Sequence, residues 1–291
     1  MDSYQKILGE LAAKCFIPLI EDILDKKKSV IYHFTQHQDF QKLQESAPKS
    51  ANSQYMKELL YRAHFASMSS IAKNLEWIKG MKYSYENGLY LPFASSFRSL
   101  IESVADSFEA LQCVGVTIAE HHEVINNKLN KVGDEFVIIS QLENDLIHYS
   151  HARRMEKGED APLSHKAKNA ADYVKGLDKR TEKKFYDCYG ELCQLTHPAA
   201  QGVLHMMPQI NESDFSFENG FGKEKIKVLI NKYSDLIEHL VVFAFNPGLI
   251  TLKVLNHIEL DECHSKILYS VNLDGVPAWK KCEKHLGVNC K

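Results

Sequence analysis

Residues 91–111 read LPFASSFRSLIESVADSFEAL and carry apolar side chains at three- and four-residue steps. The recurring apolar residues are Phe93, Phe97, Leu100, Ile101, Val104, Phe108 and Leu111. This spacing places them on one continuous face of an α-helix. Pro92 suits the first helical turn, where its missing N–H costs no hydrogen bond. The stretch therefore predicts a long core helix on which the rest of the chain packs.

Two charged residues lie on this helix away from its densest apolar stripe. Arg98 and Glu102 are one turn apart, and the small residues Ala94, Ser95 and Ala105 line the flank beside Arg98. A second element could approach closely there and cover the guanidinium. One interpretation is a surface ion pair, worth only ~0.3–0.5 kcal/mol. The other is an arginine held by Glu102 and directed at a phosphate or a carboxylate.

Outside this stretch the pattern is also helical, and strand signals are nearly absent. Apolar periodicity predicts further helices over residues 4–25, 54–85 and 223–245, the last ending at Asn246-Pro247-Gly248. Strand-like alternation occurs only in the tail, around a possible Asp274-Gly275 turn. The expected fold class is all-α, an antiparallel helical bundle with a small irregular C-terminal appendix.

The same pattern predicts three parts of the chain. Residues 1–53 are expected to form an N-terminal helical extension, residues 54–256 the core of the bundle, and residues 257–291 the appendix. The segment 156–184 is strongly charged and contains Gly158, Pro162 and Gly176. It predicts a loop with a short helix over residues 166–175.

Composition narrows the class of protein. The chain has 291 residues, of which 44% are hydrophobic and 25% charged, as in soluble globular proteins. A net charge of -3 predicts no general attraction to nucleic acid or membranes, although a local basic groove is compatible with it. Seven cysteines without a framework spacing indicate a reduced, cytoplasmic chain. We find no signal-peptide core and no apolar run of ~18–20 residues, so no membrane partner is expected.

A polar helical face follows in residues 144–154. Asn144, His148 and His151 are spaced i, i+4 and i+7 and share that face, with Arg153 and Arg154 just beyond it. It is either a solvated face or a general acid/base cluster, because histidine titrates near physiological pH.

His197 is predicted to end a helix, because Pro198 disfavours helical backbone at the residue before it. Exposed carbonyls at a helix end favour a protonated imidazole, so this placement is structurally sufficient on its own. Tyr186 and Cys193 run along the same part of the helix and could frame the ring.

Cofactor and metal motifs are sparse. Four soft ligands in the tail, Cys263, Cys282, His285 and Cys290, could hold a tetrahedral zinc ion, although their spacing matches no common zinc module. The chain has no Gly-rich phosphate loop, no G-x-S-x-G elbow and no dinucleotide fingerprint. No cofactor is therefore expected.

Three stretches together resemble a known group. They are FASSFRSLIESVADSFEAL (93–111), LENDLIHYSHARR (142–154) and FYDCYGELCQLTHPAA (185–200). The first resembles the Arg-and-Glu helix of the HEPN-like superfamily, and more narrowly of uncharacterised bacterial proteins found among abortive-infection and phage-defence genes. The last resembles the Tyr…Leu…His-Pro helix end of those proteins. The resemblance covers residues 55–245.

The resemblance implies a helical bundle, usually dimeric, whose active members are metal-independent ribonucleases. Their motif is an arginine followed four to six residues later by a histidine. This chain lacks that motif, and Asn144-x6-His151 is its nearest pattern. What carries over is the placement of Arg98 and His197. Arg98 would hold a phosphate, and His197 or His151 would move a proton.

Two hypotheses follow for the function. In the first, the chain is a HEPN-like effector that binds or cleaves RNA or a nucleotide, as a homodimer or within a defence complex. Its catalytic set would be Arg98, Glu102, His148, His151 and His197, with Asn144, Tyr186, Arg153 and Arg154 binding substrate. In the second, it is a non-catalytic helical interaction module or a regulatory subunit. Convergence of the polar side chains in one site favours the first hypothesis, and their dispersal favours the second.

Overall fold

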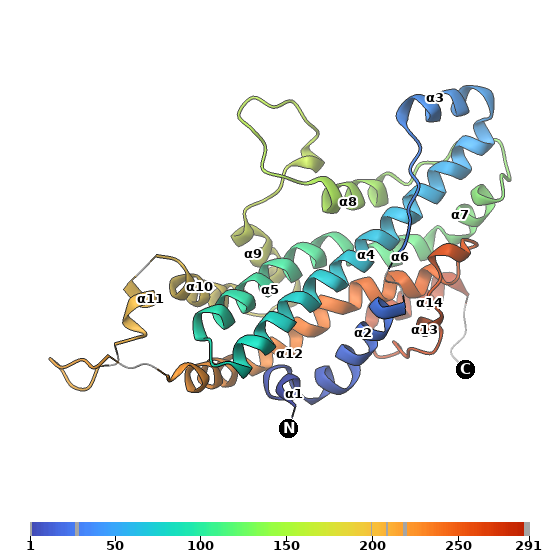
Figure 1. Cartoon of the computed structure of the whole chain (residues 1–291). Helices are drawn as coiled ribbons and strands as arrows, with labels where there is room; N and C mark the ends of the chain where they lie inside the picture. Colours follow the sequence, from blue (N-terminus) through green and yellow to red (C-terminus); the bar gives the residue numbers. More distant parts are fainter. Residues whose placement is uncertain (1, 27–28, 199, 208, 218–219, 288–291) are drawn as a thin grey trace. The chain divides into compact units, whose positions relative to one another are not determined.

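The computed structural model describes residues 2–26, 29–198, 200–207, 209–217 and 220–287. These residues form an all-α helical bundle, which confirms the predicted fold class (Figure 1). The described ranges contain two isolated β-bridges and no β-strand. The chain divides into two compact units. The three-part division at residues 53 and 256 stays a prediction.

The first unit consists of Met1–Glu21, Ile71–Glu109 and Lys168–Phe245. The second consists of Asp22–Ser70, Ala110–Ala167 and Asn246–Lys291. Two long helices contribute residues to both units, namely α4 (Pro48–Glu86) and α12 (Gly222–Leu255). The other helices of the first unit are α1 (Ser3–Leu8), a π-helical turn (Ala12–Phe16), α5 (Tyr90–Leu111, as far as Glu109), α9 (Ala170–Thr181), α10 (Phe185–Thr196) and α11 (Ala200–Leu204).

Helix α5 is a buried helix of the first unit, as its apolar pattern predicts. Of the seven residues in the stripe, Phe108 is half-buried, and the other six are at most 1% exposed. The Phe97 ring lies edge-on to Phe93 and to Tyr233, each with a centroid distance of 6.4 Å. In Figure 1, α5 runs back alongside the end of α4 after the Asn87–Gly88 turn. Burial of this stripe removes a large apolar surface from water, which stabilises the unit.

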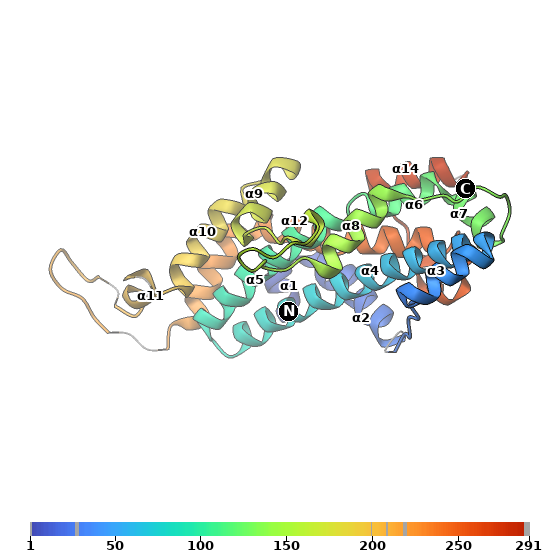
Figure 2. The same cartoon turned by 90° about the horizontal axis from the view of Figure 1, so that it is seen from above.

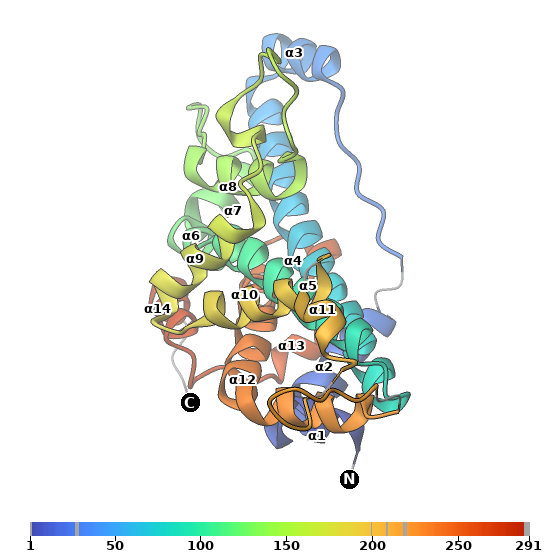
Figure 3. The same cartoon turned by 90° about the vertical axis from the view of Figure 1, so that its left-hand side faces the viewer.

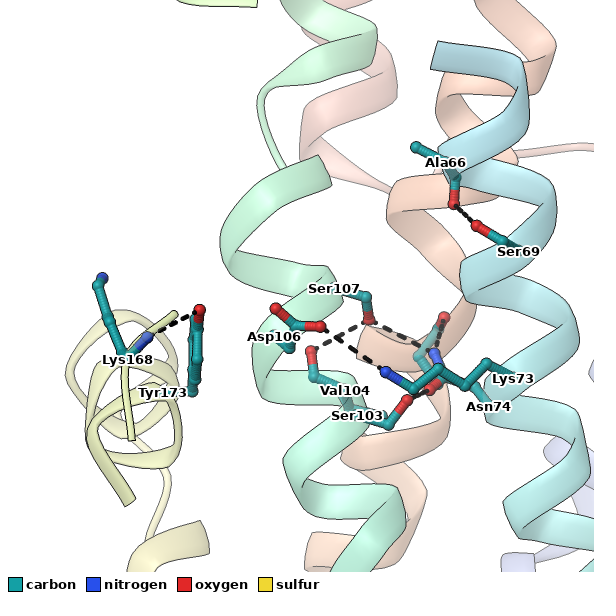
Figure 4. Close-up of polar contacts among 11 residues, drawn as sticks. Ala66, Ser69, Lys73, Asn74, Ser103, Val104, Asp106, Ser107, Lys168 and Tyr173 are labelled. Carbon is teal, nitrogen blue, oxygen red and sulfur yellow. Dashed lines mark hydrogen bonds and ion pairs between the residues drawn. The ribbon is translucent and has the colours of Figure 1, made fainter. Parts of the chain in front are cut away.

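A buried polar network joins three helices of the first unit (Figure 4). Asn74 of α4 is fully buried; its Oδ1 accepts a hydrogen bond from Ser103 Oγ at 2.6 Å. Its Nδ2 donates to the carbonyl of Ala244 in α12 at 3.0 Å and faces Ser107 Oγ at 3.5 Å. Buried polar groups are costly unless they are paired, so this network fixes the register of α4, α5 and α12.

The prediction that Asn246-Pro247-Gly248 ends a helix is wrong, because α12 continues to Leu255. The backbone of α12 leaves helical geometry at Tyr233 instead, with φ −117° and ψ 18°. Beyond Pro247 the apolar spacing goes on through Leu249, Leu252 and Leu255, all at most 1% exposed. Each such side chain gains ~1.5–3 kcal/mol on burial, which together outweighs the ~3 kcal/mol that an interior proline costs.

Helix α12 is also the one helix in the described part of the chain that is long and apolar enough to cross a membrane. In the fold, 61% of its most apolar window is buried inside the protein. The core helices of soluble proteins share both properties.

Gly222, the first residue of α12, lies against the turn that precedes α5. A Cβ atom there would stand 1.8 Å from the carbonyl oxygen of Gly88, which is backbone and cannot rotate away. We expect Gly222→Ala to lower the free energy of unfolding by about 1–3 kcal/mol. The matched control is Gly190→Ala in α10, where a Cβ meets nothing within 4 Å and should stabilise the helix by about 0.5–1 kcal/mol. Denaturant melts of equal stability for both variants would contradict this close approach.

Helices α9 and α10 lie side by side (Figures 2 and 3). The predicted short helix over 166–175 is displaced, since α9 spans Ala170–Thr181. Its buried residues are Tyr173, Val174 and Leu177, which share one helical face. Because the segment 156–184 is strongly charged, its sequence pattern did not indicate this short apolar face.

The second unit holds the short helices around the remaining part of α4. They are α2 (Ile17–Lys26, from Asp22 onward), α3 (His37–Ser46), α6 (Val114–Glu120), α7 (His122–Leu129), α8 (Ser140–His151), α13 (Lys266–Tyr269) and α14 (Pro277–Leu286), with 3-10 turns at Leu163–His165 and Asp261–Cys263. Helix α14 packs against α6 (Figure 2).

The strand-like character expected in the tail is wrong for residues 277–286. Pro277 stands in the first turn of α14, and Trp279 and Cys282, three residues apart, are the buried side chains of the helix. Proline cannot donate in a β-ladder but is pre-organised for a helix start. The two-residue alternation upstream ends in the turn at Asp274 and Gly275.

Candidate functional site

Arg98 reaches from α5 to the C-terminal end of α10. Its Nη1 donates a hydrogen bond to Thr196 Oγ1 at 2.9 Å and lies 3.1 Å from His197 Nε2. The side chain is 19% exposed, so the guanidinium is largely but not fully withdrawn from water. The small residues that flank Arg98 on α5 include Ala94 and Ala105, and both are buried.

His197 is the C-terminal cap of α10. Its backbone N–H bonds to the carbonyl of Cys193 at 2.9 Å, and its own backbone is extended, with φ −85° and ψ 160°. The helix thus ends where Pro198 predicts. A guanidinium only donates hydrogen bonds, so in the contact with Arg98 the Nε2 atom of His197 accepts and the ring proton is on Nδ1. The exposed ring therefore carries its lone pair toward Arg98.

Glu102 completes the cluster from one turn further along α5. Its Oε1 is 3.6 Å from Arg98 Nε, an ion pair longer than a hydrogen bond. Nε itself is buried and has no hydrogen-bond partner among the described residues. The guanidinium therefore keeps unused donor capacity beside a carboxylate, and a small rotation would satisfy it.

Tyr189 is a neighbour of this cluster that the sequence did not single out. Burial, the contact with Cys193 and the negative charge of Glu102 raise the pKa of its hydroxyl, so Tyr189 stays protonated and neutral. Tyr189, Cys193 and His197 are spaced i, i+4 and i+8 on one face of α10. That spacing is the signal that would have found Tyr189; Thr196 adjoins His197 directly.

Tyr186 lies three turns before His197 on α10 and takes no part in these contacts. Its ring is 37% exposed and stacks on Tyr189 at 6.3 Å, while Lys175 Nζ lies 4.9 Å from its centroid. It lines an open pocket of ≈ 510 Å³ together with Asp187, Gly190, Glu191, Gln194 and Leu195, so the pocket also holds two carboxylates. An exposed aromatic ring beside a lysine is suited to stacking a nucleobase.

The remaining predicted residues belong to the second unit, so the expectation of one shared cleft stays a prediction. His148 Nδ1 is 2.9 Å from the carbonyl of Ser164, and the His151 ring stacks on His165. Arg153 forms an ion pair with Glu159. Asn144 and Arg154 are exposed.

The predicted soft-ligand cluster of the tail is not assembled in the part of the chain that the structure describes. Cys263 and Cys282 are buried, His285 lies 3.4 Å from Glu120, and Cys290 is outside the described residues. No group of three or more His, Cys, Asp or Glu suited to a metal occurs in the described ranges. Burial raises the pKa of Cys282 to about 12, which disfavours the thiolate that zinc requires.

Comparisons of the chain with protein-family models, with curated proteins and with solved structures give no match. Any function therefore rests on the geometry of the chain's own residues, with the Arg98–His197 contact foremost.

Proposed function

We propose that this chain is a HEPN-like effector that acts on RNA, with Arg98 and His197 as the centre of its site. The observation that carries the proposal is the 3.1 Å contact between Arg98 Nη1 and His197 Nε2. It puts a phosphate-binding cation next to a group that can accept a proton. RNA cleavage through the 2′-hydroxyl needs these two functions together.

The reaction would begin with an exchange of partners at Arg98. A phosphodiester entering the site takes the Nη1 donor of the guanidinium and releases Nε2 of His197. His197 then takes the proton of the 2′-hydroxyl as the 2′-oxygen attacks phosphorus and the bond to the 5′-oxygen breaks. The proton returns to the leaving 5′-oxygen through solvent, and the products are a 2′,3′-cyclic phosphate and a 5′-hydroxyl. Glu102 orients Arg98 throughout.

Exposed basic residues near α10 support RNA as the ligand. Lys175, Lys179 and Lys184 are exposed, and none of them has a carboxylate partner among the described residues. They lie on α9 or in the turn that leads from it into α10. Single-stranded RNA is held by such cations together with stacking rings, and Tyr186 supplies a ring of this kind.

We expect Arg98→Ala to weaken binding of a fluorescent single-stranded RNA, measured by anisotropy. The loss of one phosphate contact should also reduce the slope of log K against log salt by about 0.7. Lys6→Ala in α1 removes an exposed positive charge of the same unit and should leave both quantities unchanged. If Arg98→Ala binds as tightly as wild type, with the same salt slope, Arg98 holds no phosphate.

The resemblance to phage-defence proteins supports a role for this activity in bacterial anti-phage defence, in the cytoplasm. The alternative function is a non-catalytic interaction module, and a separate observation favours it. Large apolar side chains are exposed at the end of α11, Val203 at 64% and Leu204 at 52%, and between α11 and α12, Ile210 at 68%, Phe215 at 51% and Phe217 at 74%. A cluster of this kind is typical of a protein-binding surface, here for a second copy of the chain.

The two functions separate in one experiment. RNA binding and cleavage by wild type support the RNA-acting effector, whereas a wild-type protein that neither binds nor cuts RNA contradicts it. In that case light scattering should detect a dimer at micromolar concentration, and Phe217→Ser should shift it to a monomer.

A further inference from the structure

The loop that follows α8 is closed against the end of that helix. The N–H of Arg153 bonds to the carbonyl of His165 at 2.9 Å, and the N–H of Ala167 bonds back to the carbonyl of Arg153 at 3.0 Å. A 3-10 turn, Leu163–His165, lies just before these two hydrogen bonds, and the N–H of His165 donates to the carbonyl of Pro162. We call the two backbone hydrogen bonds between Arg153 and residues 165–167 the clip. These bonds hold His165 at a fixed position beside the last turn of α8.

The clip brings two imidazoles face to face. The rings of His151 and His165 are 5.8 Å apart between centroids and 25° from parallel. His148, one turn earlier on α8, is tied to the loop through Nδ1 and the carbonyl of Ser164 at 2.9 Å. Nδ1 of His151 is 2.8 Å from Ser150 Oγ, so the ring orientation is also fixed.

The groups around this pair are predominantly basic. Arg62 of α4 acts electrostatically on His151, as do His165 and Arg153. Arg62 has no ion pair with a carboxylate in the described part of the chain; its guanidinium lies 4.9 Å from the Phe34 ring centroid. Three acidic residues on the segments that carry these groups make other contacts. Glu159 pairs with Arg153, and Asp145 accepts a hydrogen bond from Gln141 and faces His148. Glu58, one turn before Arg62 on α4, accepts hydrogen bonds from the N–H of Thr35 and from Gln54 Nε2.

The basic groups around His151 make its protonated form less favourable, and a bound anion would remove this effect. Burial first, and then the positive charges of Arg62, His165 and Arg153, lower the pKa of His151, against an opposing contact with the carbonyl of Ile147. Like charges held close together without a counter-charge are unfavourable, and they become favourable when a shared anion binds.

We propose that Arg62, His151 and His165 form a binding site for a phosphate monoester, such as the 5′-phosphate end of an RNA or a free nucleotide. A guanidinium and two imidazoles supply a planar fork and two ring N–H donors to one group of oxygens. A monoester dianion matches this accumulation of positive charge better than the single charge of a backbone phosphodiester. The site lies in the second unit and does not depend on catalysis at Arg98.

Proton uptake accompanies binding. His151 is neutral in the free protein near neutral pH, because its pKa is lowered, whereas the anion favours its protonated form. The affinity should therefore rise as pH falls from about 8 to about 6. Sulfate is the probe for this profile, since it stays a dianion over the whole range and only the protein titrates.

The test uses calorimetric titration of the full chain with sulfate. We expect Arg62→Gln and His151→Gln each to weaken binding about tenfold, as for loss of a hydrogen bond to a charged group. His151→Gln should also flatten the pH profile. His37→Gln, an exposed histidine of the same unit, is the matched control and should change neither. Circular dichroism checks that each variant is folded.

A second arm compares the two sources of the monoester, the 5′-phosphate end of an RNA and a free nucleoside 5′-monophosphate. A 5′-phosphorylated RNA oligonucleotide should bind more tightly than its 5′-hydroxyl counterpart, and the difference should vanish in Arg62→Gln. Equal affinity of the two oligonucleotides for wild type excludes the RNA end as the source, and if a nucleoside 5′-monophosphate also binds no more tightly than its nucleoside, the monoester assignment is overturned. Sulfate affinity that is unaffected by Arg62→Gln and His151→Gln overturns the site itself. Neither result bears on cleavage at His197, which is assayed separately.

Discussion

Replacing Phe97 with alanine is expected to lower the free energy of unfolding by about 3–5 kcal/mol. The ring is 1% exposed and packs between Phe93 and Tyr233, on α5 and α12 of the first unit. Its removal leaves a cavity that the neighbouring rings cannot fill without leaving their rotamers. The transfer free energy lost with the ring and the free-energy cost of the cavity therefore add. Urea denaturation followed by circular dichroism measures the change.

Phe217→Ala is the matched control for Phe97→Ala, because the same atoms are removed from a ring that is 74% exposed. We expect its effect to stay within about 0.5 kcal/mol. A loss below about 1 kcal/mol for Phe97→Ala would contradict a core built on α5. A large loss in Phe217→Ala would show that the exposed segment is covered in solution.

The burial of α5 was predictable because an apolar stripe at helical spacing has one stable environment in water. Phe93, Phe97 and Val104 were assigned to the core from their spacing, and all three are fully buried. The continuation of α12 past Pro247 was not predictable from local rules. Its stability comes from side chains buried by packing, including Leu252, and from the partner that Asn74 provides to the carbonyl of Ala244.

The candidate site, too, was only partly predictable from the sequence. The sequence indicated that Arg98 stands next to small residues and that His197 ends a helix. The contact between them joins residues 98 and 197, and such a pairing has no periodic signature because it is set by the packing of α10 on α5. His165 was not predicted as a site residue for a related reason. It lies in a loop held to Arg153 by a backbone hydrogen bond, and such a bond has no characteristic sequence pattern.

His197→Ala is expected to reduce RNA cleavage by ~10² to 10⁴-fold while leaving RNA binding nearly intact. The imidazole supplies the proton acceptor that lies against Arg98 Nη1, whereas the phosphate contact comes from Arg98 itself. Folding should survive, because the ring is exposed and the variant loses one hydrogen bond, worth about 1 kcal/mol. Single-turnover cleavage of a labelled RNA at saturating protein measures the chemical step apart from binding.

A structural role for His197 is distinguished by chemical rescue. Added imidazole should restore part of the cleavage by His197→Ala if the ring moves a proton, and should restore none if the ring only caps α10. His239→Ala, which removes a partly exposed histidine of the same unit paired with Asp235, controls for loss of another imidazole and should cleave like wild type. A folded His197→Ala protein that cleaves at the wild-type rate would remove His197 from the reaction. Arg98, Thr196 and His197 would then be a clamp that fastens the end of α10 to α5.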